Sequence, residues 1–403
     1  MDTSSPRPSA KPIRGNSFYI GLLSFFGGIS QDIFIPILPL YLANILGFDK
    51  SFIGMTEGLV TSSASIFKLV SGFLSDRLKA RKSIVFIGYS LSMVSRPLLA
   101  VVASGAGVLG LRFLDGVGKG IKDSPKDALI ADSAVAGTRG KEFGIVRALD
   151  TLGSVAGPLL LFALLYVLRD NSLKYHYIFF LTAIPLFATL GILTFFVREA
   201  RAETNVTPRI SVKLPRSFYV FLLIVVIFSL GNSSDTFLIL RTQNLGVGIL
   251  GIPLVYALFN FCYASASIPL GSLSDQIGRE KVLFLGWLAY ALAYLGFGFA
   301  NQAYQAWLLF AFYGIYYATT EGVAKAFIAD LVPSDHRGSA YGIYNTAVGL
   351  ITLPASLIAG LLWDKVNSSM PFFFGAGFAA LALVLLFFYM RVFAVSNHAS
   401  RLV

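Results

Sequence analysis

The stretch Gly72-Phe-Leu-Ser-Asp76 returns roughly 199 residues later as Gly271-Ser-Leu-Ser-Asp275. Each copy ends an apolar run, is accompanied by basic residues and precedes another apolar run. A repeat with the period of half the chain, inside an apolar sequence, is typical of membrane proteins built from two related halves. It also assigns each residue of the first half a counterpart in the second.

The composition is that of a chain embedded in lipid. Of its 403 residues, 56% are hydrophobic and only 13% are charged, with a mean hydropathy of +0.72. Soluble domains contain about 25% charged residues. Because a membrane-spanning helix needs about 20 apolar residues, the chain has room for roughly twelve. The apolar runs cover 17–46, 52–74, 83–103, 108–130, 143–168, 177–197, 218–240, 249–273, 282–300, 306–331, 341–363 and 371–393.

These runs predict an all-α membrane protein with twelve transmembrane helices in two pseudo-symmetric six-helix bundles. We expect an N-terminal tail at 1–16, bundles at 17–197 and 218–393, a linker at 198–217 and a C-terminal tail at 394–403. The basic residues gather in the linker and after the second, fourth and eighth runs. The positive-inside rule therefore predicts a multi-pass protein of the inner (plasma) membrane with both tails and the linker in the cytoplasm.

Composition also argues against other classes of protein. The net charge of +11 is explained by these cytoplasmic loops, so it does not indicate nucleic-acid binding. The single cysteine, Cys262, forms no disulfide within the chain and no cysteine metal site, and the three histidines suggest no metal site. The segment Lys119–Asp127 lacks the spacing of a phosphate loop. We interpret it as the cytoplasmic end of the fourth helix.

The repeated loop resembles the signature of the major facilitator superfamily, Gly-x-Leu-x-Asp-Arg-x-Gly-Arg-Lys. The second copy lacks the first Arg, and the first copy has Lys79 and Ala80 where the family has Gly and Arg, with Arg81 as a substitute. The resemblance implies a latch that opens when the halves rock; the alternative is a solvated loop. The latch residues are Gly72, Asp76, Arg77, Arg81, Gly271, Asp275 and Arg279.

Two other segments resemble family signatures. Arg112-Phe-Leu-Asp-Gly-Val-Gly118 is similar to the fourth-helix pattern, in which the Arg of proton-coupled members is associated with proton transfer. Gly153, Gly157 and Pro158 resemble the fifth-helix pattern associated with antiporters. Ordinary packing of small residues is the alternative for these two glycines.

The repeat pairs Gly28–Phe34 with Gly231–Phe237, which makes Asp32 and Asp235 counterparts near the middle of the first and seventh runs. A carboxylate there costs about 2.5–3.5 kcal/mol on insertion scales. Low dielectric favours the neutral carboxyl group, which suits a proton carrier. In the family these helices line the central cavity. The alternative is a structural hydrogen bond to a neighbouring helix.

Further charges fall inside the predicted membrane region, and intramembrane charges indicate function by default. Glu321 and Lys325 are spaced i, i+4, so a mutual ion pair is their alternative role. Arg96 precedes Pro97, which predicts a kink with freed carbonyl groups. The candidate solute- and proton-coupling residues are Asp32, Asp235, Glu57, Arg112, Arg96, Lys68, Glu321 and Lys325.

The resemblance implies a secondary active transporter of a small solute, which is not an enzyme and needs no cofactor besides the proton gradient. The fifth-helix pattern favours efflux by antiport. The alternative is proton symport of an anionic metabolite, with Lys68, Arg96 and Arg112 as an anion clamp. A membrane sensor that binds without transport is a third class. Members of this family usually work as monomers in membrane lipid.

Overall fold

The computed structural model describes residues 15–78, 80–133, 139–199, 214–333 and 336–399, without the side chains of 73, 76, 139–141 and 394–399. The first half contains α1 (Asn16–Asn44), α2 (Lys50–Leu78), α3 (Arg81–Leu98), α4 (Gly105–Ser133), α5 (Arg139–Val167), α6 (Lys174–Leu181) and α7 (Ala183–Phe195). The second contains α8 (Arg216–Gly231), α9 (Thr236–Asn244), α10 (Gly251–Ile277), α11 (Arg279–Phe299), α12 (Ala303–Leu331), α13 (Arg337–Lys365) and α14 (Met370–Ala399).

These helices make twelve spanning segments, because two pairs are broken spans. Thr182 alone separates α6 from α7, and residues 232–235 separate α8 from α9. Among the described residues, eight segments are long and apolar enough to cross a membrane by composition alone. The other four, α2, α3, α4 and α12, carry Glu57, Lys68, Arg96, Arg112, Glu321 and Lys325. The predicted all-α fold is confirmed.

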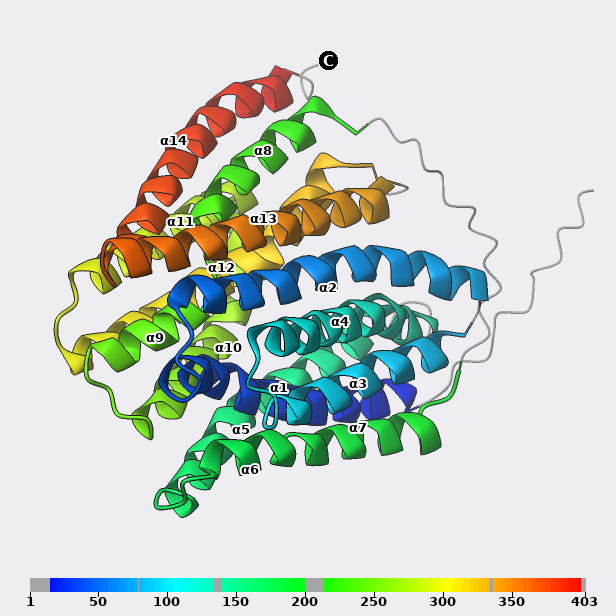
Figure 1. Cartoon of the computed structure of the whole chain (residues 1–403). Helices are drawn as coiled ribbons and strands as arrows, with labels where there is room; N and C mark the ends of the chain where they lie inside the picture. Colours follow the sequence, from blue (N-terminus) through cyan, green and yellow to red (C-terminus); the bar gives the residue numbers. More distant parts are fainter. Residues whose placement is uncertain (1–14, 79, 134–138, 200–213, 334–335, 400–403) are drawn as a thin grey trace, which may run out of the picture.

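The helix ends gather at two opposite faces of the molecule (Figure 1), and side-chain contacts join the ends within each face. The amide of Asn16, in the first turn of α1, donates to Ser133 Oγ at the end of α4 and to the carbonyl of Arg198 beyond α7. At the opposite face, Asp364 near the end of α13 accepts from the backbone N–H groups of Lys50 and Ser51 at the start of α2. We call these the basic face and the outer face.

The two halves pack through α2 against α13 and α5 against α10 (Figure 1). Ser62 Oγ donates to the Gly349 carbonyl over 2.8 Å, and Asn260 Nδ2 donates to the Ser154 carbonyl over 2.7 Å. Near the outer face, Leu40 of α1 belongs to the second half's apolar core, and Leu240 of α9 belongs to a core of the first half. The halves therefore interlock on that face.

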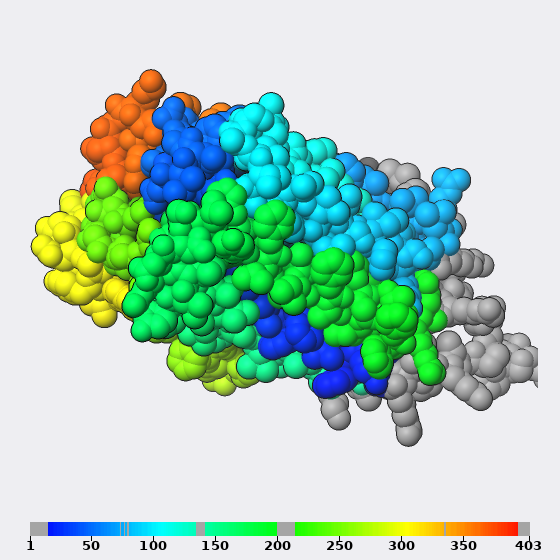
Figure 2. Space-filling model, turned by 60° about the horizontal axis from the view of Figure 1, so that its bottom comes forward, coloured from blue at the N-terminus to red at the C-terminus, as the bar shows by residue number. Residues whose placement is uncertain are grey.

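The lateral surface is apolar, as expected of helices in contact with lipid. Figure 2 shows one such side, where the green residues of α6 and α7 run beside the dark blue of α1. Phe187 and Phe195 on α7 are 63% and 82% exposed, and Ile268 on α10 is 80% exposed. Aromatic and aliphatic side chains at this exposure need a non-aqueous environment.

Small residues let α1 and α5 approach closely. A Cβ at Gly153 would overlap the carbonyl oxygen of Phe25, and one at Gly157 would lie 2.9 Å from the Cβ of Asp32. The two glycines of the fifth-helix pattern thus hold α5 against the segment of α1 that carries Asp32. Pro158 follows them inside α5.

We predict that Gly153→Ala destabilises the protein by about 1–3 kcal/mol, because the added methyl group forces the two backbones apart. Gly377→Ala in α14 is the matched control, since its Cβ would meet no described atom within 4 Å. That control should be neutral or stabilising, because alanine favours the helix. Thermal unfolding of the detergent-solubilised variants measures both, and equal melting temperatures would refute the packing argument.

Arg241 of α9 links the ends of three helices at the outer face of the second half, α9, α11 and α14. Its guanidinium donates to the carbonyls of Phe297 (3.1 Å) and Ala300 (2.8 Å) at the end of α11. It also donates to the hydroxyl groups of Ser368 and Ser369 just before α14. The residue is 6% exposed. A guanidinium, with five donors, suits this cluster of neutral acceptors at a helix C-terminus.

We predict that Arg241→Met lowers the free energy of unfolding by about 3 kcal/mol, because carbonyl groups that accepted from a charged donor lose it. Arg241→Lys should recover part of the loss, since an ammonium retains the charge with fewer donors. Arg169→Met is the control, because Arg169 is 58% exposed and its pair with Asp170 lies in solvent. Chemical unfolding in detergent compares the three variants.

Candidate functional site

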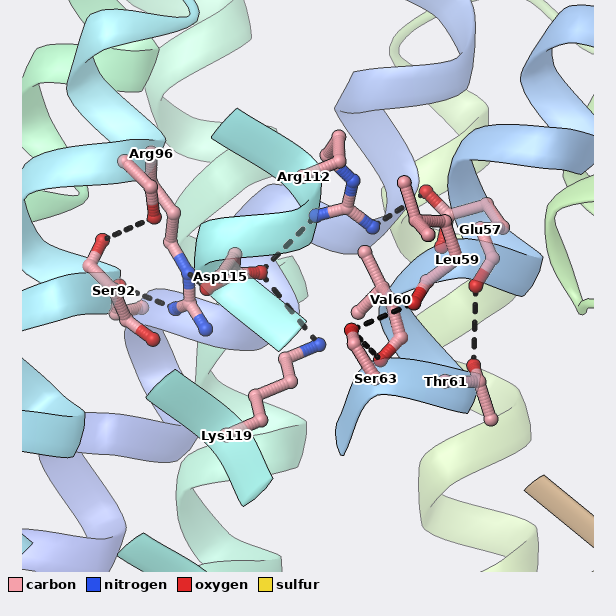
Figure 3. Close-up of polar contacts among 12 residues, drawn as sticks. Glu57, Leu59, Val60, Thr61, Ser63, Ser92, Arg96, Arg112, Asp115 and Lys119 are labelled. Carbon is pink, nitrogen blue, oxygen red and sulfur yellow. Dashed lines mark hydrogen bonds and ion pairs between the residues drawn. The ribbon is translucent and has the colours of Figure 1, made fainter. Parts of the chain in front are cut away.

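A buried ion cluster joins α3 and α4 inside the first half (Figure 3). Arg96 Nε and Arg112 Nη1 each donate to a different carboxylate oxygen of Asp115, both over 3.1 Å. The two arginine side chains are 2% exposed and the aspartate is fully buried. One carboxylate therefore holds two guanidinium groups in a low-dielectric interior, where unpaired charges are costly.

The cluster extends to α2 and α1. Arg112 Nη2 donates to Glu57 Oε1 over 2.6 Å, and Arg96 Nη1 donates to Ser30 Oγ over 3.0 Å. The ring of Phe34 lies under both guanidinium groups, 5.6 Å from that of Arg96 and 5.2 Å from that of Arg112. Four helices are thus tied to one set of charges.

Three residues of this cluster were predicted from sequence as site candidates, and the structure places them together: Arg96, Arg112 and Glu57. The central residue, Asp115, was not among the candidates. Its spacing of i, i+3 from Arg112 was the signal that could have identified it. Pro97 lies one residue before the end of α3 at Leu98, and the kink at this proline stays a prediction.

A cavity of about 360 Å³ opens beside this cluster, between α1, α2 and α4 of the first half and α13 of the second. Its lining residues are Gln31, Val60, Thr61, Ala64, Ser65, Lys68, Lys119, Lys122, Asp123, Asn345, Val348 and Gly349. Lys119 Nζ lies 3.9 Å from Asp115 Oδ2, which connects the cavity to the ion cluster (Figure 3).

This geometry corrects the interpretation of Lys119–Asp127 as the cytoplasmic end of a helix. The helix α4 continues to Ser133, so Lys119 and Lys122 lie well inside it and line the cavity. The charged residues suggested the end of a helix, because the local composition does not show whether a helix faces solvent, lipid or an internal cavity. Lys68, a predicted candidate, lines the same cavity and lies 3.7 Å from Asp123.

Asp32 is buried, 5% exposed, where α1 packs on α5. Among the described residues no cation lies within 4.0 Å of its carboxylate. Its neighbour Gln31 lines the cavity, whereas the Cβ of Asp32 lies against Gly157 of α5. Asp32 is therefore adjacent to the cavity rather than part of its wall.

Asp235 lies in a different setting from its counterpart. It ends the 232–235 break and accepts hydrogen bonds from the hydroxyl groups of Tyr313 and Tyr317 on α12, both over 2.8 Å. These tyrosines were not predicted, since tyrosines in an apolar run give no sign of the partner they face.

Glu321 bridges the two halves. Arg147 Nη2 of α5 lies 3.3 Å from Glu321 Oε2 on α12. The hydroxyl group of Tyr263 on α10 donates to the same carboxylate oxygen and accepts a hydrogen bond from Arg147 Nη2 over 2.5 Å. The alternative role of Glu321, an ion pair with Lys325 on its own helix, gives way to this contact with α5. Tyr341 donates to the Lys325 carbonyl.

The repeated loops form equivalent contacts in the two halves. Arg81 pairs with Asp132 and donates to the Ala128 carbonyl on α4. Arg279 pairs with Asp330 over 2.8 Å and donates to the Ala326 carbonyl on α12. Arg81 therefore occupies the position of Arg279, although the aligned motif residues differ.

The other latch residues are less alike. Asp275 lies 3.3 Å from Arg279, whereas the side chain of Asp76 lies outside the described residues. Arg77 is exposed in the last turn of α2. A Cβ at Gly72 would lie 2.7 Å from Ser124 Oγ, but one at Gly271 would meet no described atom within 4 Å. A close approach to Ser124 of α4 thus favours a glycine at 72, whereas no described neighbour requires one at 271.

Comparison with known proteins identifies the family. The model described as Major Facilitator Superfamily matches residues 20–240 and 220–401. An uncharacterized MFS-type transporter of Methanocaldococcus jannaschii is 39% identical over 382 residues, covering 93% of this chain and 94% of that protein. The multidrug resistance protein MdtG of Salmonella paratyphi A is 29% identical over 333 residues, covering 75% of this chain and 78% of that protein.

Solved structures share the fold at low identity. A nucleoside transporter, NupG, superposes with a TM-score of 0.77 at 13% identity, covering 94% of this chain and all (100%) of that one. A D-xylose–proton symporter gives 0.73 at 16%, covering 92% and 97%. With the repeated loops and the two packed halves, these matches show that the chain belongs to the Major Facilitator Superfamily of membrane transporters.

Proposed function

We propose that this chain is a proton-coupled secondary transporter that exports a small solute by alternating access. The observation that carries the proposal is the cavity between the halves, bordered by charged side chains that are otherwise expensive to keep in a membrane. The similarity to a multidrug resistance protein supports export. We further propose that the chain works as a monomer, with the bundles, linker and tails at the residues predicted above.

The positive-inside rule supports a cytoplasmic location for the basic face, and hence for both tails, in the plasma membrane. The ends of α2, α3, α8 and α11 at this face carry Arg77, Arg81, Lys82, Arg216, Arg279 and Lys281. Fewer basic residues lie at the outer face, where Lys50, Arg169, Lys174, Arg241 and Lys365 are found.

Two sets of contacts support rocking of the halves. At the outer face, Asp364 caps α2, so a carboxylate from one half meets the positive end of a helix from the other. Nearer the basic face, Arg147 and Glu321 join the halves through an ion pair. Within each half, the pairs of Arg81 with Asp132 and Arg279 with Asp330 are our proposed latches.

We predict that Asp364→Ala and Arg147→Gln shift the conformational equilibrium in opposite directions. Each variant removes a contact worth about 1 kcal/mol, which changes the ratio of the two states about fivefold. Asp364→Ala should favour opening of the outer face, and Arg147→Gln should favour opening of the basic face. Double electron–electron resonance distances between labels at Ser172 and Asn301, in a Cys262→Ser background, report the change.

Asp170→Ala is the control for that pair, because Asp170 is 91% exposed at the outer face and contacts only its neighbour Arg169 among the described residues. Its distance distribution should match that of the parent. The rocking model is wrong if the two bridging variants shift the distribution the same way.

Proton symport of an anionic metabolite is the second candidate, favoured by the lysines in the cavity wall. Proteoliposomes with an imposed pH gradient separate the two directions. If external acidification drives a solute out against its gradient, the transporter is an antiporter; if it drives the solute in, it is a symporter. A trapped dye records the lumenal pH during these experiments. If no solute in a panel changes the lumenal pH, proton coupling itself is contradicted.

A further inference from the structure

We propose that the solute is a small anion and that Lys68, Lys119 and Lys122 bind its carboxylate or phosphate group. We call these residues the cavity lysines. The inference rests on the proposed transport function and names the chemical class of its solute. It keeps Lys68 from the clamp expected from sequence, which consisted of Lys68, Arg96 and Arg112, and replaces the two arginines by Lys119 and Lys122.

The cavity lysines are poorly satisfied by the protein. Lys68 Nζ and Lys122 Nζ each lie 3.7 Å from an oxygen of Asp123, and Lys119 Nζ lies 3.9 Å from Asp115. A charge-assisted hydrogen bond measures about 2.7–2.9 Å, so these distances leave room for a better acceptor. Each ammonium group carries three donors. Their N–H groups are available to a ligand in the cavity.

The arginines, in contrast, are already paired with carboxylates, although Arg112 Nε has no hydrogen-bond partner among the described residues. Arg96 donates to Asp115 and Ser30, and Arg112 donates to Asp115 and Glu57. Both are 2% exposed, whereas Lys68, Lys119 and Lys122 are 37%, 20% and 11% exposed. The arginine cluster is therefore a fixed support behind the site, and the lysines are the groups that a solute meets.

Among the described groups joined by ion pairs within 4.0 Å, this network has two more cations than carboxylates, and the buried Asp32 lies outside it. Its cations are Arg96, Arg112, Lys68, Lys119 and Lys122, and its carboxylates are Glu57, Asp115 and Asp123. The wall from α13 contributes Asn345, Val348 and Gly349, which are uncharged. Buried charges are normally paired, so an anion of one or two charges would compensate this surplus.

The rest of the cavity suits a small polar solute. Gln31, Thr61, Ser65 and Asn345 offer uncharged hydrogen-bonding groups around the lysines. The volume of about 360 Å³ is at the lower end for ligand sites. Lys122 is also held over the ring of Tyr89, 4.6 Å from its centroid, which restricts where its ammonium group points.

Asp123 allows a test in which two substitutions should change the anion affinity in opposite directions. Its carboxylate sits near two cavity lysines and competes with an incoming anion for them. Removing its charge should therefore tighten anion binding, while removing a lysine charge should weaken it. A residue that merely supports the fold would not produce opposite effects on affinity from two neighbouring substitutions on one helix.

The test is ligand-induced stabilisation of the purified full chain at constant ionic strength. The probes are inorganic phosphate, glycerol 3-phosphate, lactate, succinate and citrate, with choline and xylose as cationic and neutral comparisons. We expect at least one anion to raise the melting temperature by about 3 °C or more. The phosphate and carboxylate arms distinguish the two acceptor chemistries.

Titration of the best anion then compares variants. Lys119→Gln and Lys122→Gln should weaken its affinity by about tenfold or more, and Asp123→Asn should strengthen it. Lys365→Gln, on the exposed outer end of α13, should leave affinity unchanged. Stabilisation by choline or xylose alone, by no anion, or by an anion that the lysine variants bind equally well would overturn the proposal.

Flux measurements separate this inference from the proposed function. An anion that binds through the cavity lysines but is not moved by proteoliposomes would refute transport and leave the site standing. A cation or neutral solute moved in exchange for protons would refute the anion site and leave proton-coupled transport standing.

Discussion

Asp115→Asn is expected to destabilise the protein by about 4 kcal/mol, because it leaves buried cations without their shared counter-charge. Asp115 is fully buried and binds Arg96 and Arg112 through its two oxygens. Asparagine keeps the shape and one acceptor but none of the charge. Chemical unfolding in detergent measures the loss, and the melting temperature should fall with it.

A double variant shows that charge rather than shape causes the loss. Asp115→Asn combined with Arg96→Gln removes one of the stranded cations, so the two effects should be clearly less than additive. Asp170→Asn is the control, since Asp170 is 91% exposed. Additive losses, or an Asp115→Asn variant as stable as the parent, would show that the cluster does not depend on this carboxylate.

Asp32→Asn is expected to abolish proton-driven flux, by about a hundredfold or more, while the protein stays folded. Asp32 is 5% exposed and has no cation within 4.0 Å among the described residues, so it is free to exchange a proton without breaking an ion pair. Asparagine has nearly the same volume, so the close contact of α1 with Gly157 should persist. Dye-loaded proteoliposomes record the proton movement.

Solute exchange without a pH gradient is the internal control for Asp32→Asn. Exchange should continue, because it requires solute binding and rocking but no net proton transfer. The comparison variant is Asp235→Asn, in which Tyr313 and Tyr317 still have an amide oxygen to donate to. If Asp32→Asn retains the proton-driven flux of the parent, Asp32 is not the proton carrier. If only Asp235→Asn loses that flux, Asp235 in the second half is the proton carrier.

The repeat predicted a good deal of the architecture. The number of spans follows from the apolar runs, because each span must bury its own backbone hydrogen bonds within lipid. The repeat also supplied Arg81 as the counterpart of Arg279, and the structure gives both arginines an aspartate and a backbone carbonyl on the corresponding helix. Counterparts in sequence were less reliable for detail, as Gly72 and Gly271 show.

The candidate site was only partly predictable, for a physical reason. Sequence reveals which charges lie at membrane depth, because each one interrupts an apolar run. It does not reveal which partner neutralises a charge. Glu321 pairs with Arg147 from the other half rather than with a neighbour on its own helix, and Asp32 lies where α1 packs on α5 rather than in the wall of the cavity.

The sequence by itself determined a two-half, twelve-helix membrane fold and its family, since hydropathy and the repeated loop are properties of the chain read in order. Only the tertiary structure decided which cations remain available. It enclosed Arg96 and Arg112 around Asp115 and left Lys68, Lys119 and Lys122 facing a cavity. Charge compensation depends on distances of a few ångströms between helices, and those distances are set by packing rather than by sequence order.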